Sequence, residues 1–297
     1  MALRAIFWNP GEARIRAFWR VFVQFAVLVV LVLATRQLLL SASGSVPGWL
    51  LALVELVITL AVVGLATRFL DRRRLVDIGL HLDRRWWLDL GVGVVLGGLL
   101  MAGIFAVEWV AGWITVVEVA PSGALLWALA ALPITVMAAA SEELLSRGYQ
   151  MKNAAEGLCS ARVGPRAAIA LGLIATSLFF GLGHVGGPHS GLDSFLVLSA
   201  VGVLFAVSYL VTGELGLCIG LHAGWNRFQG GVFGFSVSGH EATESFVAIT
   251  QGGPPLWTGG STGRKPGCSG WLRASSALSW CWGGCGCRGA SWPCGPR

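Results

Sequence analysis

The feature that most constrains this chain is a set of apolar runs long enough to cross a lipid bilayer. About 20 apolar residues in helical conformation span the hydrocarbon core. The runs Val119 to Ser141 and Ser194 to Gly213 contain no charged residue. Only 12% of the 297 residues are charged, whereas soluble domains carry about 25%. The chain is therefore expected to fold in a membrane.

The hydropathy pattern predicts an all-α fold, a polytopic transmembrane bundle of seven to eight helices. The last predicted span is the weakest, because it is rich in glycine and contains His222, Asn226 and Arg227. The seven predicted spans are 17–40, 49–67, 89–110, 123–147, 167–184, 193–212 and 215–235.

Basic residues alternate between the two sides of this predicted bundle. They cluster before the first span, between the second and third, and between the fourth and fifth, whereas 37–48, 111–122 and 185–192 contain no Lys or Arg. The positive-inside rule then predicts a cytoplasmic N-terminus, and we expect an integral protein of a bacterial plasma membrane. A nucleic-acid partner is not expected despite the net charge of +6, because short basic clusters between apolar runs are typical of membrane topology signals. In the basic segment after the second span, Trp86 and Trp87 are expected at headgroup level.

Ionisable side chains inside a membrane are costly, so each one there is a functional candidate. At the end of the fourth span, Glu143 and Arg147 are four residues apart and can pair on one helix face. Glu142 lies about 100° around the helix from Glu143, so it takes no part in this predicted pair. A carboxylate in a partly dry site is suited to activating water as a general base, although charged residues also commonly mark the point where a helix leaves the membrane.

Two further polar pairs have the same helical spacing. Phe180 and His184 close the fifth span, and His222 and Asn226 lie in the seventh, so each pair projects from one helix face. Hydrogen-bonding groups such as His222 and Asn226 could hold a developing oxyanion. The alternatives are an interfacial histidine at a helix end and a polar pair that joins two helices.

Taken in order, Glu142-Glu143…Arg147, Phe180…His184 and His222…Asn226 resemble the motifs of the CPBP family. This family joins type II CAAX prenyl endopeptidases with bacteriocin-processing and bacteriocin-immunity proteins, and the resemblance covers roughly residues 124–234. It implies a membrane helix bundle that hydrolyses peptide bonds of membrane-associated peptide or protein substrates. Membrane lipids are the other expected partners.

The resemblance also implies a role for each site residue. Glu142 would activate water with help from His184, while His222 and Asn226 would stabilise the oxyanion. Glu143 and Arg147, with Phe180 beside His184, would orient the site. Glu142 and His184 can meet only if the fourth helix continues past Arg147 to near Asn153.

Whether a metal takes part stays open at this stage. A catalytic zinc site uses three protein ligands and one open position, and Glu142, His184 and His222 could supply them. The chain has no His-Glu-x-x-His helix, which favours metal-free, glutamate-dependent hydrolysis.

The resemblance suggests four regions: an N-terminal cytoplasmic segment (1–16), N-terminal helices with a basic loop (17–120), a CAAX-protease-like catalytic region (121–240) and an aberrant tail (241–297). From about Ser261 the tail is rich in Gly, Cys, Trp and Arg, which indicates a disordered or frameshifted segment. Two other functions compete with the endopeptidase. A non-catalytic immunity or partner-binding protein would be expected to have lost a site residue, and a transporter would be expected to show internal repeats, which the sequence lacks.

Overall fold

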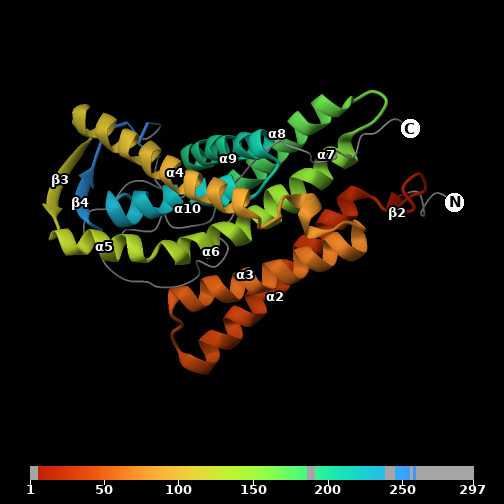
Figure 1. Cartoon of the computed structure of the whole chain (residues 1–297), viewed down its shortest axis with the longest axis horizontal. Helices are drawn as coiled ribbons and strands as arrows, with labels where there is room; N and C mark the ends of the chain where they lie inside the picture. Colours follow the sequence, from red (N-terminus) through yellow and green to blue (C-terminus); the bar gives the residue numbers. More distant parts are fainter. Residues whose placement is uncertain (1–5, 186–190, 238–244, 255–256, 259–297) are drawn as a thin grey trace.

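The computed structural model describes residues 6–185, 191–237, 245–254 and 257–258. Helices dominate this part of the chain, and its strands form two short antiparallel pairs. The predicted all-α membrane fold class is confirmed (Figure 1).

The helices and strands follow one another along the chain in this order. The α-helices are α2 (Ala17–Ser43), α3 (Gly48–Leu65), α4 (Arg84–Val110), α5 (Ser122–Ala130), α6 (Leu132–Glu143), α7 (Lys152–Leu158), α8 (Pro165–Gly183), α9 (Leu192–Thr212) and α10 (Gly216–Asn226). The π-helical segments are η1 (Ala66–Leu70), η3 (Leu144–Met151) and η4 (Arg227–Val232), and η2 (Leu75–Ile78) is a 3-10 helix. The strands are β1 (Trp8–Asn9), β2 (Arg14–Ile15), β3 (Ile114–Val119) and β4 (Val247–Gln251).

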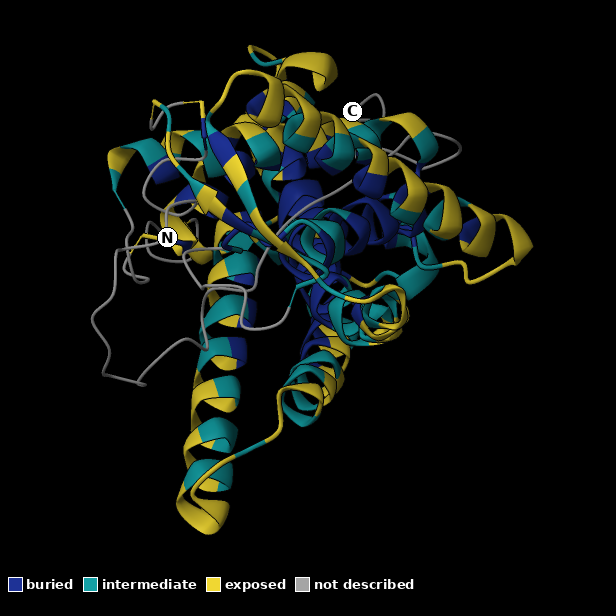
Figure 2. Cartoon of the chain, turned by 90° about the vertical axis from the view of Figure 1, so that its left-hand side faces the viewer, coloured by how far each residue is buried: buried dark blue, intermediate teal, exposed yellow. Residues whose placement is uncertain are grey.

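Six helical stretches of the described chain are long and apolar enough to cross a membrane. Large apolar side chains on their outer faces are exposed, for example Phe18 at 69%, Val110 at 84% and Trp127 at 80%, and buried residues concentrate in the centre of the molecule (Figure 2). Such a continuous apolar exterior is typical of a surface covered by lipid. The six stretches are Ala17–Ser43, Gly48–Leu70, Arg84–Val110, Ser122–Leu158, Pro165–Gly183 and Leu192–Thr212.

The seventh predicted span, 215–235, is instead a short helix, α10, continued by η4. Eight of the eleven residues of α10 are buried, because it packs inside the bundle against α4 (Figure 1). Glycines make this approach possible. A Cβ on Gly220 would lie 2.0 Å from the carbonyl oxygen of Leu90, and one on Gly97 would lie 2.4 Å from that of Leu221. Small residues at such an interface let two helix backbones come into contact.

The fourth predicted span divides at Ala131, whose ψ of 2° leaves the helical range. Pro133 follows two residues later, and proline disrupts the helical hydrogen bonds of the preceding turn. Beyond this break the helix continues through α6, η3 and α7 to Leu158. The predicted continuation past Arg147 is therefore confirmed.

This continuation brings α7 and α8 together as an antiparallel pair. A Cβ on Gly172 of α8 would lie 3.0 Å from the backbone nitrogen of Ala155. Glu142 precedes Ala155 by 13 residues and His184 follows Gly172 by 12 residues. At about 1.5 Å per residue, both lie roughly 18–20 Å from the crossing, and hence at the same level of the bundle.

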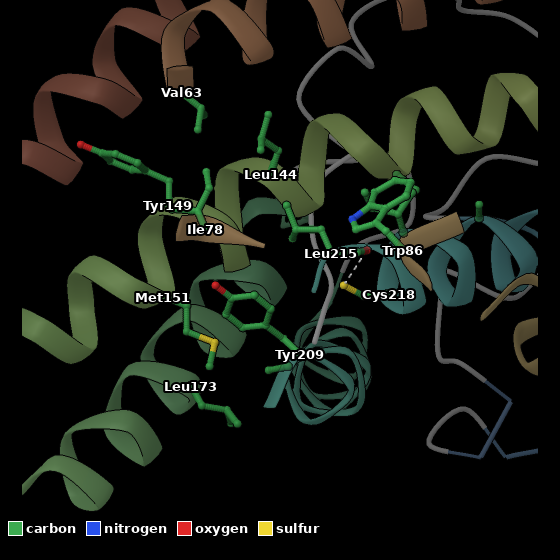
Figure 3. Packing of buried hydrophobic residues seen from close by; sticks show 14 of the residues in the cluster. Val63, Ile78, Trp86, Leu144, Tyr149, Met151, Leu173, Tyr209, Leu215 and Cys218 are labelled. Carbon is green, nitrogen blue, oxygen red and sulfur yellow. Dashed lines mark hydrogen bonds between the residues drawn. The ribbon is translucent and has the colours of Figure 1, made fainter. Parts of the chain in front are cut away.

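A buried apolar cluster holds these helices in register (Figure 3). It joins residues from α3, η2, α4, η3 and α10, among them Val63, Leu144 and Cys218. Trp86 belongs to this cluster, being 4% exposed with its indole N–H bonded to the carbonyl of Gly79 at 3.1 Å. Trp86 is therefore held inside the protein, and its position at headgroup level stays a prediction. Trp87 is 57% exposed.

Strands β3 and β4 form a sheet at the end of α4 that the sequence analysis did not predict. Ile114 pairs with Gln251 and Val119 with Val247, with a bulge between Val116 and Glu118. Strand β4 lies in the segment assigned to the tail, and its Ile249 is buried with Met101. The aberrant stretch from Ser261 onward lies outside the described residues.

Candidate active site

Residues from all three sequence motifs line one cavity of about 440 Å³. Glu142 comes from α6, Phe180 from α8 and Asn226 from α10, while His184 directly follows α8 and His222 lies in α10. The carboxylate and both imidazoles are largely shielded, since Glu142 is 1%, His222 5% and His184 7% exposed. The structure thus brings together the four side chains predicted to carry the chemistry.

His222 lies at the centre of a chain of hydrogen bonds. Its Nδ1 is 2.8 Å from Oε1 of Glu143, and its Nε2 is 2.8 Å from the amide nitrogen of Asn226. A carboxylate accepts and an amide nitrogen donates. These partners therefore favour the tautomer in which Nδ1 carries the proton and Nε2 accepts from Asn226.

The two neighbouring carboxylates have different surroundings. Glu142 lines the cavity, with one oxygen 3.7 Å from Nε2 of His222. Glu143 is fully buried behind the imidazole and holds its Nδ1. Only Glu142 is therefore placed to meet a molecule in the cavity.

His184 is fixed by the last turn of α8. Its Nδ1 lies 2.9 Å from the carbonyl oxygen of Phe180, and the two rings are 4.6 Å apart. A carbonyl can only accept, so Nδ1 carries the proton and Nε2 is the nitrogen able to take one up. Phe180 thus orients His184 through both its backbone and its ring.

Arg147 is fully buried and bonds to α9. Its guanidinium donates to the carbonyl of Gly202 at 2.6 Å and to the hydroxyl of Ser146. This bond attaches η3, the segment that follows Glu142 and Glu143, to helix α9. The predicted Glu143–Arg147 orienting pair stays a prediction.

Two residues of the site, Phe205 and Gln229, were not predicted from the sequence. The ring of Phe205 stacks on His222 at 5.1 Å and 25°, yet Phe205 lies within a featureless apolar run. Gln229 accepts from the indole of Trp225 at 2.8 Å and lines the cavity beside Asn226. Its spacing of three residues from Asn226 could have indicated a shared helix face.

The described residues contain no group of three His, Cys, Asp or Glu side chains placed to hold a metal ion. Both ring nitrogens of His222 have partners, Glu143 and Asn226. Glu142, His184 and His222 therefore do not fit the zinc ligand set that the sequence left open.

A buried carboxylate, two imidazoles and an amide inside a membrane helix bundle define a candidate intramembrane hydrolase. Residues 121–228 match the family model described as type II CAAX prenyl endopeptidase Rce1-like. This match covers a little over a third of the chain and includes every predicted site residue. It agrees with the CPBP resemblance and supports a CAAX-type protease in an integral membrane protein. No curated protein and no solved structure matches the chain.

Proposed function

We propose that this chain is an intramembrane endopeptidase that hydrolyses peptide bonds of membrane-associated substrates. The observation that carries the proposal is the convergence of Glu142, His184, His222 and Asn226 on one buried cavity. A cavity of about 440 Å³ lies within the range of small-molecule and peptide pockets, roughly 300–1,000 Å³.

The geometry suggests a division of labour among these side chains. Glu142 removes a proton from water, whose oxygen attacks the carbonyl carbon of the scissile bond. One N–H of Asn226 bonds to His222, and its second N–H is available to the developing oxyanion. The proton held by Glu142 then passes to the leaving amine as the carbon–nitrogen bond breaks. Nε2 of His184 is a second position at which a proton can be held.

The apolar exterior and the basic clusters suggest where this protein lies in the cell. Six helices are long and apolar enough to cross a membrane, so we expect lipid to cover their outer faces, and the basic segments favour a cytoplasmic N-terminus in a bacterial cell. The substrate reaches the cavity as a membrane-associated peptide or protein segment, and no nucleic acid takes part.

The test is peptide cleavage by the detergent-purified full chain. A mixed peptide library, read by mass spectrometry, is incubated with the wild type, Glu142→Gln and Glu118→Gln. Glu118 is exposed on β3, so its variant is a control for carboxylate removal. Loss of a general base typically costs about 10²- to 10⁴-fold in rate, and we expect such a loss in Glu142→Gln alone.

Folding is checked for each variant by its thermal unfolding midpoint. Equal cleavage by Glu142→Gln and the wild type would overturn the role of Glu142. A folded wild type that cleaves nothing in the library would favour the alternative function, a non-catalytic immunity or partner-binding membrane protein. A chelator titration on the active sample tests for a metal requirement.

A further inference from the structure

A second polar group lies at the opposite end of the cavity and has no part in the proposed chemistry. Glu108 is in the last turn of α4, is 4% exposed and lines the same cavity as Glu142. Burying a carboxylate in a membrane protein is costly. A group that bonds to the Glu108 carboxyl is therefore expected to offset the cost of its burial.

The protein supplies only part of that compensation. Oε2 of Glu108 accepts a hydrogen bond from the side-chain amide of Gln251 at 2.8 Å, and this amide also lies 3.3 Å from the carbonyl of Thr258. Among the described residues, the side chain of Gln251 is the one donor to this carboxyl group, and no Lys, Arg or His forms an ion pair with it. Strand β4 thus fixes the carboxyl group of Glu108 through Gln251, and no described basic side chain pairs with it.

The packing of α4 against α10 gives the distance along α4 between Glu108 and the level of His222 and Asn226. Helices α4 and α10 run parallel, and a Cβ on Gly97 would meet the backbones of Leu221 and Trp225. Gly97 is therefore level with His222 and Asn226. Glu108 lies 11 residues beyond Gly97, about 16 Å along the helix at 1.5 Å per residue. An extended peptide covers this in about five residues at roughly 3.3 Å each, and in fewer when a long side chain completes the reach.

Apart from Gln229, the cavity wall that belongs to neither end is mostly apolar. Met101 and Ile104, which lie between Gly97 and Glu108 along α4, and Leu204 and Phe205 of α9 are among the residues that line the cavity. A ligand that fills it must therefore present apolar groups between a hydrolysable bond at one end and a cationic or donor group at the other.

We propose that Glu108 is a specificity-determining residue that binds a lysine or arginine side chain of the substrate, three to five residues from the scissile bond. The intervening substrate residues are apolar and fill the space between the two ends. This inference rests on the proposed endopeptidase function, because it names the substrate class of the same cavity. It assigns Gln251 and strand β4 to positioning Glu108.

The test measures binding separately from cleavage. Fluorescent apolar peptides carry one lysine, stepped along the peptide, and each has a matched peptide with norleucine in place of lysine. Binding is measured to the full chain with Glu142→Gln, which removes the proposed general base. At one lysine position we expect at least tenfold tighter binding than for the norleucine peptide.

Three variants in the Glu142→Gln background identify the origin of that preference. Glu108→Gln can still accept from Gln251 but has no charge, and it should abolish the lysine preference. Glu108→Lys should favour the peptide with glutamate at the same position, a reversal that a purely structural role would not produce. Glu118→Gln should leave the preference unchanged. In the cleaving enzyme, Glu108→Gln should raise KM for the lysine peptide and leave kcat unchanged.

The outcomes separate this inference from the proposed function. A lysine preference that persists in Glu108→Gln, or that appears at no position while the wild type cleaves the library, would overturn the role of Glu108 alone. A preference that Glu108→Gln abolishes, in a protein that cleaves nothing, would support the binding site and count against the peptidase.

Discussion

At the residue scale, the geometry of the site depends on the residues that hold each polar side chain in place. His222 is held on one side by Glu143 and on the other by Asn226, each at 2.8 Å, and Phe205 stacks against its face. Three different elements therefore fix one imidazole. Such support keeps a site in its productive geometry, and its loss is felt in rate more than in binding.

Glu143→Gln tests this support directly. The amide oxygen can still accept from Nδ1 of His222, but the amide can also turn and donate, so it no longer enforces the tautomer in which Nε2 accepts from Asn226. Neutralising the carboxylate behind a catalytic histidine can cost up to about 10⁴-fold in kcat, and we expect a loss of about 10²- to 10⁴-fold with little change in KM. Steady-state kinetics on one cleaved peptide provide the measurement, with Glu118→Gln as control. A kcat within twofold of the wild type would show that Glu143 has no such role.

The sequence predicted which residues meet but not every bond between them. The spacing of four residues identified the pairs Phe180–His184 and His222–Asn226, because residues four apart share a helix face. It could not reveal that Glu143 bonds to His222, because these residues are 79 positions apart. Phe205 and Glu108 were missed as site residues for the same reason, since only the packing of α4, α9 and α10 places them around the cavity.

At the element scale, the contact between α4 and α10 positions two of the proposed catalytic side chains. Glycines on both helices allow carbonyl oxygens of one to touch the backbone of the other, and α10 carries His222 and Asn226 along this interface. The hydropathy pattern predicted the long spans well, because length and apolar composition decide them. The seventh predicted span, 215–235, is helical over Gly216–Asn226 and Arg227–Val232, but its burial inside the bundle could not be predicted, since a glycine-rich helix buried by its neighbours resembles a lipid-facing one in composition.

Gly220→Ala is the sharpest test of this interface. Its Cβ would lie 2.0 Å from the carbonyl oxygen of Leu90, so the helices must separate. Overpacking of this kind typically costs about 1–3 kcal/mol, and the shift should displace His222 and lower kcat. Gly103→Ala is the matched control, because its Cβ would meet nothing within 4 Å and alanine favours a helix over glycine by up to about 1 kcal/mol. Thermal unfolding in detergent and the cleavage rate are the readouts; equal midpoints for the two variants would contradict the close-packing argument.

At the scale of the whole molecule, a buried ionic network joins the basic segments at one end of the bundle. Arg20 of α2 bonds to Asp71 at 2.8 Å, and both side chains are fully buried. Glu156 of α7 pairs with Arg20 at 3.2 Å and with Arg73 at 2.9 Å. Burial, followed by the neighbouring Arg20 and Arg73, lowers the pKa of Arg14 in the same cluster. The arginines therefore depend on the two carboxylates, which tie the N-terminal segment, the loop after α3 and α7 into one unit.

This arrangement explains why the basic clusters, separate in sequence, lie together in the fold. The alternation of basic and uncharged loops predicts that they share one side of the membrane. It could not predict the network itself, because a topology signal requires only charge, whereas a buried network requires specific partners such as Asn153, whose amide donates to Asp71 at 2.7 Å.

Asp71→Ala should destabilise the whole fold, because it leaves Arg20 buried without its closest partner. Breaking a buried ion pair by removing one member costs about 3–5 kcal/mol, whereas replacing both members by apolar residues is often neutral or stabilising. We therefore expect a large fall in the thermal midpoint for Asp71→Ala and a substantial recovery in the double variant Arg20→Met with Asp71→Leu. Arg74→Ala is the control, since its side chain is 80% exposed and such surface pairs contribute about 0–1 kcal/mol. If Asp71→Ala and Arg74→Ala unfold at the same temperature, the network does not hold α2 to α7, and the apolar packing of Leu28, Val62 and Leu145 between α2, α3 and η3 must join the N-terminal helices to the rest of the bundle.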